Sequence, residues 1–314
     1  MMKINTKMST RKRVTNALIY IFLTVLAIIW LLPIAWLILN SFRGEPKGAF
    51  PQFDVKMLTT EFGLVKYSFE YYVEGFKRIL IPTKFTLDNY ILLFTDTKLF
   101  NFPRWFMNTL VVAIFSCLIS TIITLLTSYA FSRLRFKMRK PFMNLILILG
   151  MFPGFMSMIA IYHILKAMGL AQSLVSLVLV YSGGAAMNYY VSKGFFDTIP
   201  MAIDESAMID GATKNDIFWH ITLPLSKPIV VYTILTAFIA PWVDFIFVSI
   251  IMKDNYDNYT VALGLYQMLT RENIYQYFTR FCAGAVLVAI PITLLFIKMQ
   301  KYYVGGVTGG SVKG

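Results

Sequence analysis

The sequence predicts an all-α membrane protein that crosses the bilayer six times. Hydrophobic residues make up 57% of the 314 residues and charged residues only 14%. Long stretches without any charge recur along the chain, and a helix needs ~20 apolar residues to cross a bilayer core of ~30 Å. Because no water is available inside the hydrocarbon, each such stretch has to satisfy its backbone hydrogen bonds internally, as a helix does.

Six segments have the composition of transmembrane spans. Five of them contain no charge, although one of these five is short, and the sixth is interrupted by Asp244. They cover residues 14–42, 105–132, 141–165, 167–192, 228–252 and 281–297. The first is not expected to be a cleaved signal peptide, because its apolar run is far longer than the ~7–15 residues of a signal-peptide core and no A-x-A-like site follows it.

Lysines and arginines at the span ends predict the orientation. Five precede the first span and five lie within residues 133–140, whereas the short loop between spans three and four contains only Lys166. The positive-inside rule therefore places both termini, residues 133–140 and residues 193–227 in the cytoplasm. On this basis the net charge of +13 reflects topology and contact with lipid headgroups. Nucleic-acid binding is not expected.

The predicted organisation follows from these spans. A basic cytoplasmic arm is followed by span one, by an extracytoplasmic loop with enough aromatic residues to form a small cap, by a core of spans two to six, and by a glycine-rich cytoplasmic tail. The corresponding ranges are 1–15, 16–41, 42–104, 105–299 and 300–314.

Residues 193–227, called the insert below, separate spans four and five and predict two short helices around a glycine. The first helix is expected from Met201 to Ile209, directly after Pro200. Gly211 stands where a left-handed residue ends a helix. Small and apolar residues here, with Ala207 and Gly211 allowing close approach, fit the groove of a cytoplasmic partner. Periodicity alone leaves open the alternative of a loop packed under its own bundle.

The second helix of the insert is expected to begin with a capping box. Thr213 and Asp216 have the required spacing, so the helix should cover about residues 214–221. The step from Leu223 to Pro224 is expected to end it, because the residue before a proline is disfavoured in a helix. The following residues, Ser226 and Pro228, suit the start of span five.

Four residues inside the spans are candidates for the translocation path or for a gate. Asp244 is an acid within span five, where such residues line a path or form a hydrogen bond between helices. Pro241, one turn earlier, could kink that span. For Pro241, and likewise for Pro153 and Gly154 in span three, a kink suits a gate but is also common in membrane helices generally.

No cofactor, metal or catalytic site is expected in this chain. Cys117 and Cys282 lie inside predicted spans, and with His163 and His220 they have no ligand spacing. No G-x-x-x-x-G-K-[ST] motif occurs, so no nucleotide site is predicted. No nucleophile with a neighbouring base is recognisable either.

Several motifs resemble those of the permease subunits of bacterial ABC importers. Glu205-Ser206-Ala207, Gly211 and Ile221-x-Leu223-Pro224 match the spacing of the E-A-A…G…I-x-L-P loop, with Ser206 replacing the first alanine. Residues 128–136, 193–200 and 305–314 resemble the carbohydrate-uptake branch, in particular its six-span maltose and maltodextrin permeases. Residues 44–82 have no clear counterpart.

This resemblance implies a type I importer permease in the bacterial inner membrane. The chain would form half of the path beside a second permease subunit, with an ATPase dimer that binds ATP and magnesium and with an extracellular sugar-binding protein. The implied ATPase-docking residues are Glu205, Ser206, Ala207, Asp210, Gly211, Ile221, Leu223 and Pro224.

The resemblance implies maltose or maltodextrin as the substrate, with galacto-oligosaccharides, raffinose-type sugars and uronate oligomers as alternatives. Two other function classes stay open. In an ion-coupled secondary transporter Asp244 would be the coupling acid, although no second ionisable residue inside a span pairs with it. A purely structural scaffold would explain the hydropathy but not the insert.

Overall fold

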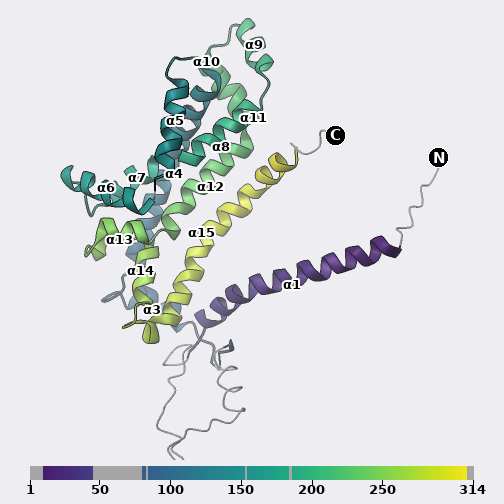
Figure 1. Cartoon of the computed structure of the whole chain (residues 1–314). Helices are drawn as coiled ribbons and strands as arrows, with labels where there is room; N and C mark the ends of the chain where they lie inside the picture. The colour runs from purple at the N-terminus through teal and green to yellow at the C-terminus, as the bar shows by residue number, and fades with distance from the viewer. Residues whose placement is uncertain (1–9, 45–79, 83, 153, 184–185, 310–314) are drawn as a thin grey trace, which may run out of the picture. The chain divides into compact units, whose positions relative to one another are not determined.

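The computed structural model describes residues 10–44, 80–82, 84–152, 154–183 and 186–309. Within these ranges the chain forms helices joined by turns, and Arg43 and Phe85 make one isolated bridge (Figure 1). The predicted all-α class is confirmed. Contacts divide the chain into two units, one of residues 1–92 and 271–286 and the other of residues 93–270 and 287–314.

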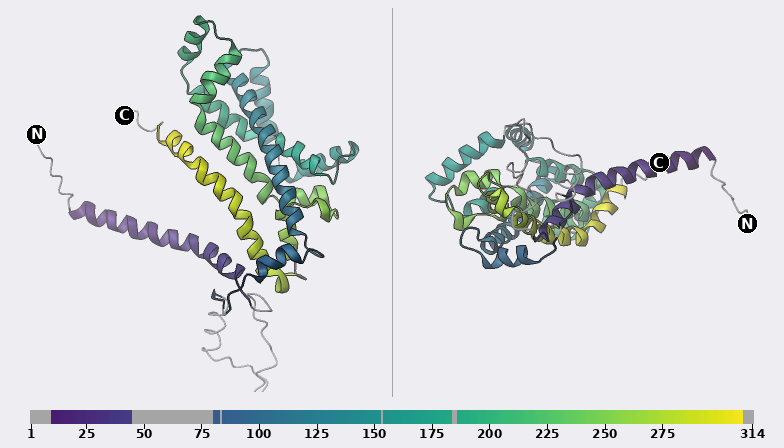
Figure 2. Two further views of the ribbon diagram at one scale, coloured as in Figure 1. Left: turned by 180° about the vertical axis from the view of Figure 1, so that it is seen from behind. Right: turned by 90° about the horizontal axis from the view of Figure 1, so that it is seen from below.

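Helix α4, Phe102–Arg133, is the centre of the larger unit. It packs against α7 (Leu174–Ser182), α8 (Ala186–Asp197), α12 (Lys227–Val243) and α14 (Val261–Met268), and the bundle is seen from two sides in Figures 1 and 2. A stripe of small hydroxyl residues at every fourth position is buried on α4: Ser116, Ser120, Thr124 and Ser128. Small residues let the backbones of membrane helices approach closely. Such close packing matters in a bilayer, because lipid provides no hydrophobic driving force for the association of helices.

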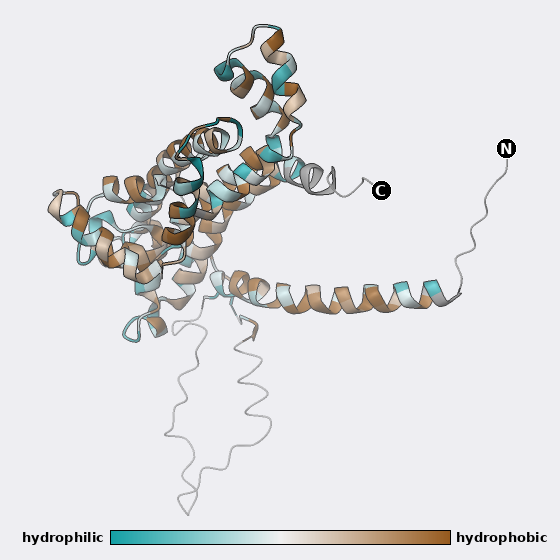
Figure 3. Cartoon of the chain, turned by 45° about the horizontal axis from the view of Figure 1, so that its top comes forward, coloured by the Kyte–Doolittle hydropathy of each residue, from teal (hydrophilic) through white to brown (hydrophobic). Residues whose placement is uncertain are grey.

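Among the described residues, four helices are long and apolar enough to cross a membrane, and the number reaches six if each of two bent pairs counts as one span. The four are α1 (Thr10–Ser41), α4, α7 with α8, and α15 (Ile274–Gly309). One bent pair is α5 (Arg139–Gly150) with α6 (Gly154–Ala167), which meet at 102°. In the other, the helical segment Lys214–Leu225 meets α12 at 84°. Figure 3 shows that α1 is apolar along most of its length.

The span boundaries need three corrections. Residues 141–165 do not form one straight helix, because the chain bends between Gly150 and Gly154. Span four begins only at Leu174, since α6 ends at Ala167 and Gly169 follows with a φ of +71°. The last helix, α15, continues through residues 300–309, which were assigned to the tail. Its glycines weaken a helix by only about 1 kcal/mol each and need not end it.

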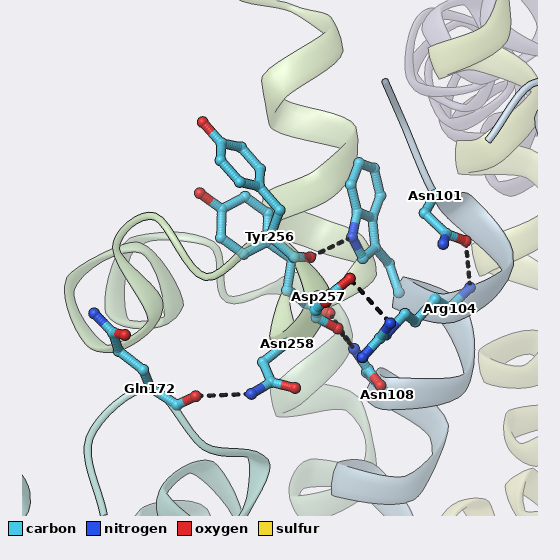
Figure 4. Close-up of polar contacts among 9 residues, drawn as sticks. Asn101, Arg104, Asn108, Gln172, Tyr256, Asp257 and Asn258 are labelled. Carbon is cyan, nitrogen blue, oxygen red and sulfur yellow. Dashed lines mark hydrogen bonds and ion pairs between the residues drawn. The ribbon is translucent and has the colours of Figure 1, made fainter. Parts of the chain in front are cut away.

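A network of polar contacts holds the loop after α13 (Ile246–Met252) to the start of α4 (Figure 4). The indole nitrogen of Trp105 donates to the Tyr256 carbonyl at 2.8 Å. Arg104 forms an ion pair with Asp257 at 2.9 Å, and the Asn108 amide donates to the Asp257 carbonyl at 2.8 Å. These contacts therefore connect the first turns of α4 to this loop.

The smaller unit fixes the end of α1. The amide nitrogen of Asn89, on α3 (Asp88–Thr95), donates to the carbonyls of Ser41 at 3.0 Å and Arg43 at 2.8 Å. Its amide oxygen accepts a bond from the Thr279 hydroxyl at 3.0 Å. The predicted cap of residues 42–104 falls largely on residues 45–79, which lie outside the described residues.

Candidate docking site in the insert

The insert folds into two helical segments around Gly211, where the sequence predicted them. Helix α9 covers Met201–Ile209. The second segment consists of α10 (Lys214–Asp216), a π-helical stretch, η2 (Ile217–Thr222), and α11 (Leu223–Leu225). In Figure 1 these elements lie together at one end of the α4 bundle.

Gly211 ends α9 in the left-handed conformation that the sequence predicted, with a φ of +88°. Its N–H donates to the Met208 carbonyl at 3.1 Å, and the N–H of Ala212 donates to the Ala207 carbonyl at 2.9 Å. These two bonds form a Schellman motif, which satisfies carbonyls that the end of a helix otherwise leaves unpaired. The turn therefore depends on a residue that tolerates a positive φ.

The capping box of the second segment is also present. The N–H of Asp216 donates to the Thr213 hydroxyl at 3.2 Å, and the Thr213 N–H donates to the Asp216 carboxylate at 3.0 Å. Hydrogen bonds from the Thr213 hydroxyl and N–H lower the pKa of Asp216. The box fixes the direction in which the chain re-enters a helix after Gly211.

The expectation that Leu223 and Pro224 end this segment is wrong. The Leu223 N–H donates to the Phe218 carbonyl, five residues back, and Pro224 lies in the first turn of α11. A proline ring clashes with the carbonyl four residues before it, and a π-helical turn changes that spacing. Ser226 does precede α12 as predicted, but its side chain makes no capping bond.

One face of α9 is turned inward. Asp204 and Ala207, one helical turn apart, are both buried. The expectation that Ala207 allows a partner to approach closely is therefore corrected, because its side chain packs within this chain. Ile217 and Phe218 are buried as well, and the Phe218 ring lies 4.9 Å from that of Tyr129 on α4.

The other face of α9 is exposed. The side chains of Glu205, Met208 and Ile209 define what we call the docking face, and Ile209 is 87% exposed. Other predicted docking residues divide by exposure: Ser206, Asp210, Gly211 and Pro224 are exposed, whereas Ile221 and Leu223 are half-buried. An apolar side chain that projects this far from a capped helix is available for contact with a partner.

Three side chains in the last two turns of α4 hold the insert in place. The Tyr129 hydroxyl donates to the Lys214 carbonyl at 3.3 Å, and the Ser132 hydroxyl donates to the Asp197 carboxylate at 2.6 Å. Arg133 is the third, and it donates to the carbonyls of Phe196 and Ile199, both at 2.7 Å. The insert is thus fastened to the central helix at several points.

Arg133 also contacts Asp204 of α9. Their side chains are only 2% and 1% exposed, and Nε of Arg133 lies 3.7 Å from Oδ2 of Asp204. Sequence reasoning did not select either residue, because Arg133 was counted among the charges that set the topology. The available signal was the spacing of Asp204 and Ala207, which places both on one face of a helix while Glu205 faces away.

Three of the four candidates for the path lie within the described residues. Asp244 accepts a bond from the Tyr181 hydroxyl at 2.9 Å and one from the Phe247 N–H at 3.0 Å, so it connects α7 to the first turn of α13. Of the two roles expected for an acid inside a span, these bonds correspond to a hydrogen bond between helices. Pro241 is buried in α12, two residues before that helix ends. Gly154 begins α6, and Pro153 lies outside the described residues.

Comparison with known proteins gives a consistent set of relatives. Residues 123–305 match the family described as "Binding-protein-dependent transport system inner membrane component". The galactooligosaccharides transport system permease protein GanQ of Bacillus subtilis is 39% identical over 236 residues, which cover 75% of this chain and 83% of GanQ. The maltodextrin transport system permease protein MalD of Streptococcus pneumoniae is 32% identical over 311 residues, which cover 99% of this chain and all of MalD.

Solved structures show the same fold. A crystal structure of a bacterial ABC transporter involved in the import of the acidic polysaccharide alginate contains a chain that superposes with a TM-score of 0.68. The match covers 94% of this chain and 99% of that chain at 20% sequence identity. The arrangement of helices is therefore that of an ABC importer permease.

Proposed function

This chain belongs to the family of binding-protein-dependent transport system inner membrane components, and we propose that it is one permease subunit of a bacterial ATP-driven importer of oligosaccharides. It would form half of the translocation path beside a second permease subunit. A sugar-binding protein would deliver the substrate from outside the cell. The insert would face the cytoplasm, together with both termini, as the lysines and arginines at the span ends indicate.

The observation that carries this proposal is the geometry of α9. The helix is capped at Gly211, is tied to α4 through its inward face, and presents Glu205, Met208 and Ile209 outward. A helix held this firmly can transmit force from a partner to a membrane span, whereas a flexible loop cannot. We infer that the partner is an ATPase dimer that binds and hydrolyses ATP with magnesium, and that the permease itself performs no catalysis.

Maltodextrins are the proposed substrates, because the maltodextrin permease MalD matches this chain over nearly its whole length. Galacto-oligosaccharides are a second candidate, favoured by the 39% identity to a permease for those sugars. Uptake of labelled maltotriose and of labelled galactotriose by the assembled transporter would separate them. Competition by only one of the unlabelled sugars would identify the substrate class.

The docking proposal is tested by reversing one charge on the docking face. Glu205→Lys should insert in the membrane at a normal level but lose most of the co-purifying ATPase, because it places a cation on the surface that the ATPase contacts. Glu272→Lys makes the same change at an exposed position outside the insert and should retain the ATPase. Full retention of the ATPase and of sugar uptake by Glu205→Lys would contradict the docking assignment.

A further inference from the structure

Two adjacent acidic residues of α9 point in opposite directions, so their side chains lie in different environments. Glu205 is exposed on the docking face, whereas Asp204 is buried against Arg133 of α4. We propose that Arg133 is a positioning residue that, through its buried ion pair with Asp204, passes the movement of α9 to the central span α4. The inference rests on the proposed function, because it assumes that an ATPase moves α9.

Because this ion pair is buried, removing the charge of either partner should destabilise the fold. Within the described residues neither oxygen of Asp204 has a hydrogen bond, and the contact to Arg133 at 3.7 Å is an ion pair that is too long for one. The first turn of α9, where Asp204 lies, also has the positive end of the helix dipole nearby. Removing one partner leaves a buried charge uncompensated, which is strongly destabilising in general.

The guanidinium joins three helices at once. Besides Asp204, it bonds to the Phe196 carbonyl in the last turn of α8 and to the Ile199 carbonyl just before α9. An arginine can do this because its planar group holds several N–H donors in fixed directions, while a lysine carries one flexible ammonium group. A displacement of α9 must therefore move Arg133 or break these contacts.

The helix that carries Arg133 is the one through which such a displacement would spread. Helix α4 packs against α7, α8, α12 and α14. Other contacts also join α4 to the insert: hydrogen bonds from Tyr129 to the Lys214 carbonyl and from Ser132 to Asp197, and the packing of the Phe218 ring on Tyr129. Because these remain when Arg133 is changed, α9 should still be presented to the ATPase, but its movement should be passed on poorly.

The test uses the complete transporter in proteoliposomes, with Arg133→Lys and Asp204→Asn as single variants. Both should keep the ATPase attached, while the sugar transported per ATP hydrolysed falls roughly tenfold. Arg135→Lys makes the same chemical change two residues away at an exposed position and should transport normally. A normal ratio of sugar to ATP in both variants would overturn the proposal, and so would loss of the attached ATPase at normal abundance.

A double variant covers the case in which the single variants fail to fold. Arg133→Met with Asp204→Leu removes both charges and replaces them with apolar side chains, a change that buried ion pairs often tolerate. We expect it to restore abundance and ATPase attachment without restoring the ratio of sugar to ATP. Recovery of that ratio would show that the pair only stabilises the fold and would refute the inference. Glu205→Lys tests the docking proposal separately, because its readout is attachment.

Discussion

Replacing Gly211 by alanine isolates the energetic cost of its left-handed backbone. Apart from its two chain neighbours, a β-carbon added at Gly211 would have no residue within 4 Å, so a steric clash with the rest of the fold does not contribute. The φ of +88° remains, and for a residue with a β-carbon the left-handed region costs about 1–2 kcal/mol. We therefore expect the Schellman turn that ends α9 to open about 5- to 30-fold more often.

Gly194→Ala is the matched control. Gly194 lies within α8, an added β-carbon there also has no atom within 4 Å outside its chain neighbours and the nearby backbone of its own helix, and its φ is not positive. Alanine is favoured over glycine in the middle of a helix by about 0.5–1 kcal/mol, so this variant should stabilise its helix. The two substitutions have the same chemistry and similar space, and they differ in the sign of φ.

Amide hydrogen exchange of the purified permease in lipid nanodiscs would measure both effects. Peptides from α9 should exchange faster in Gly211→Ala by about the factor given above, whereas peptides from α8 should exchange more slowly in Gly194→Ala. Unchanged or slower exchange of α9 in Gly211→Ala would refute the argument from backbone strain. Faster exchange of α9 with intact ATPase attachment would show that docking tolerates a partly frayed helix.

Two further predictions concern other parts of the fold. Gly264→Ala should lower the thermal stability by about 1–3 kcal/mol or more, because its β-carbon would lie 2.0 Å from the buried Trp105 ring; an unchanged melting temperature would contradict this. The contribution of Asp216 to the cap of α10 should depend on pH. Its pKa is lowered in the fold, so the contribution is present above the unfolded value of about 3.9 and is lost as the pH falls through the folded pKa. Exchange of the α10 amides at several pH values would show this loss, and Asp216→Asn should remove the dependence.

Local chemistry explains which parts of the insert could be predicted. A glycine at a helix end and a threonine three residues before an aspartate act over a few residues, so the turn at Gly211 and the capping box follow from the sequence alone. The end of the second segment could not be predicted in this way. The proline rule assumes a regular α-helix, and the π-helical stretch before Pro224 changes the hydrogen-bond spacing on which that rule depends.

The sequence by itself determined the all-α membrane class, the two helices around Gly211 and the family, because each depends on composition, on the helical period or on a short motif. Only the tertiary structure decided which way α9 faces. Turning Ala207 inward and Ile209 outward depends on how α9 lies against α4, where Arg133 contacts Asp204. The pairing of Arg133 with Asp204 joins residues from two separate helices. Such a contact is set by the packing of the whole bundle, since neither segment alone specifies the charge that it meets.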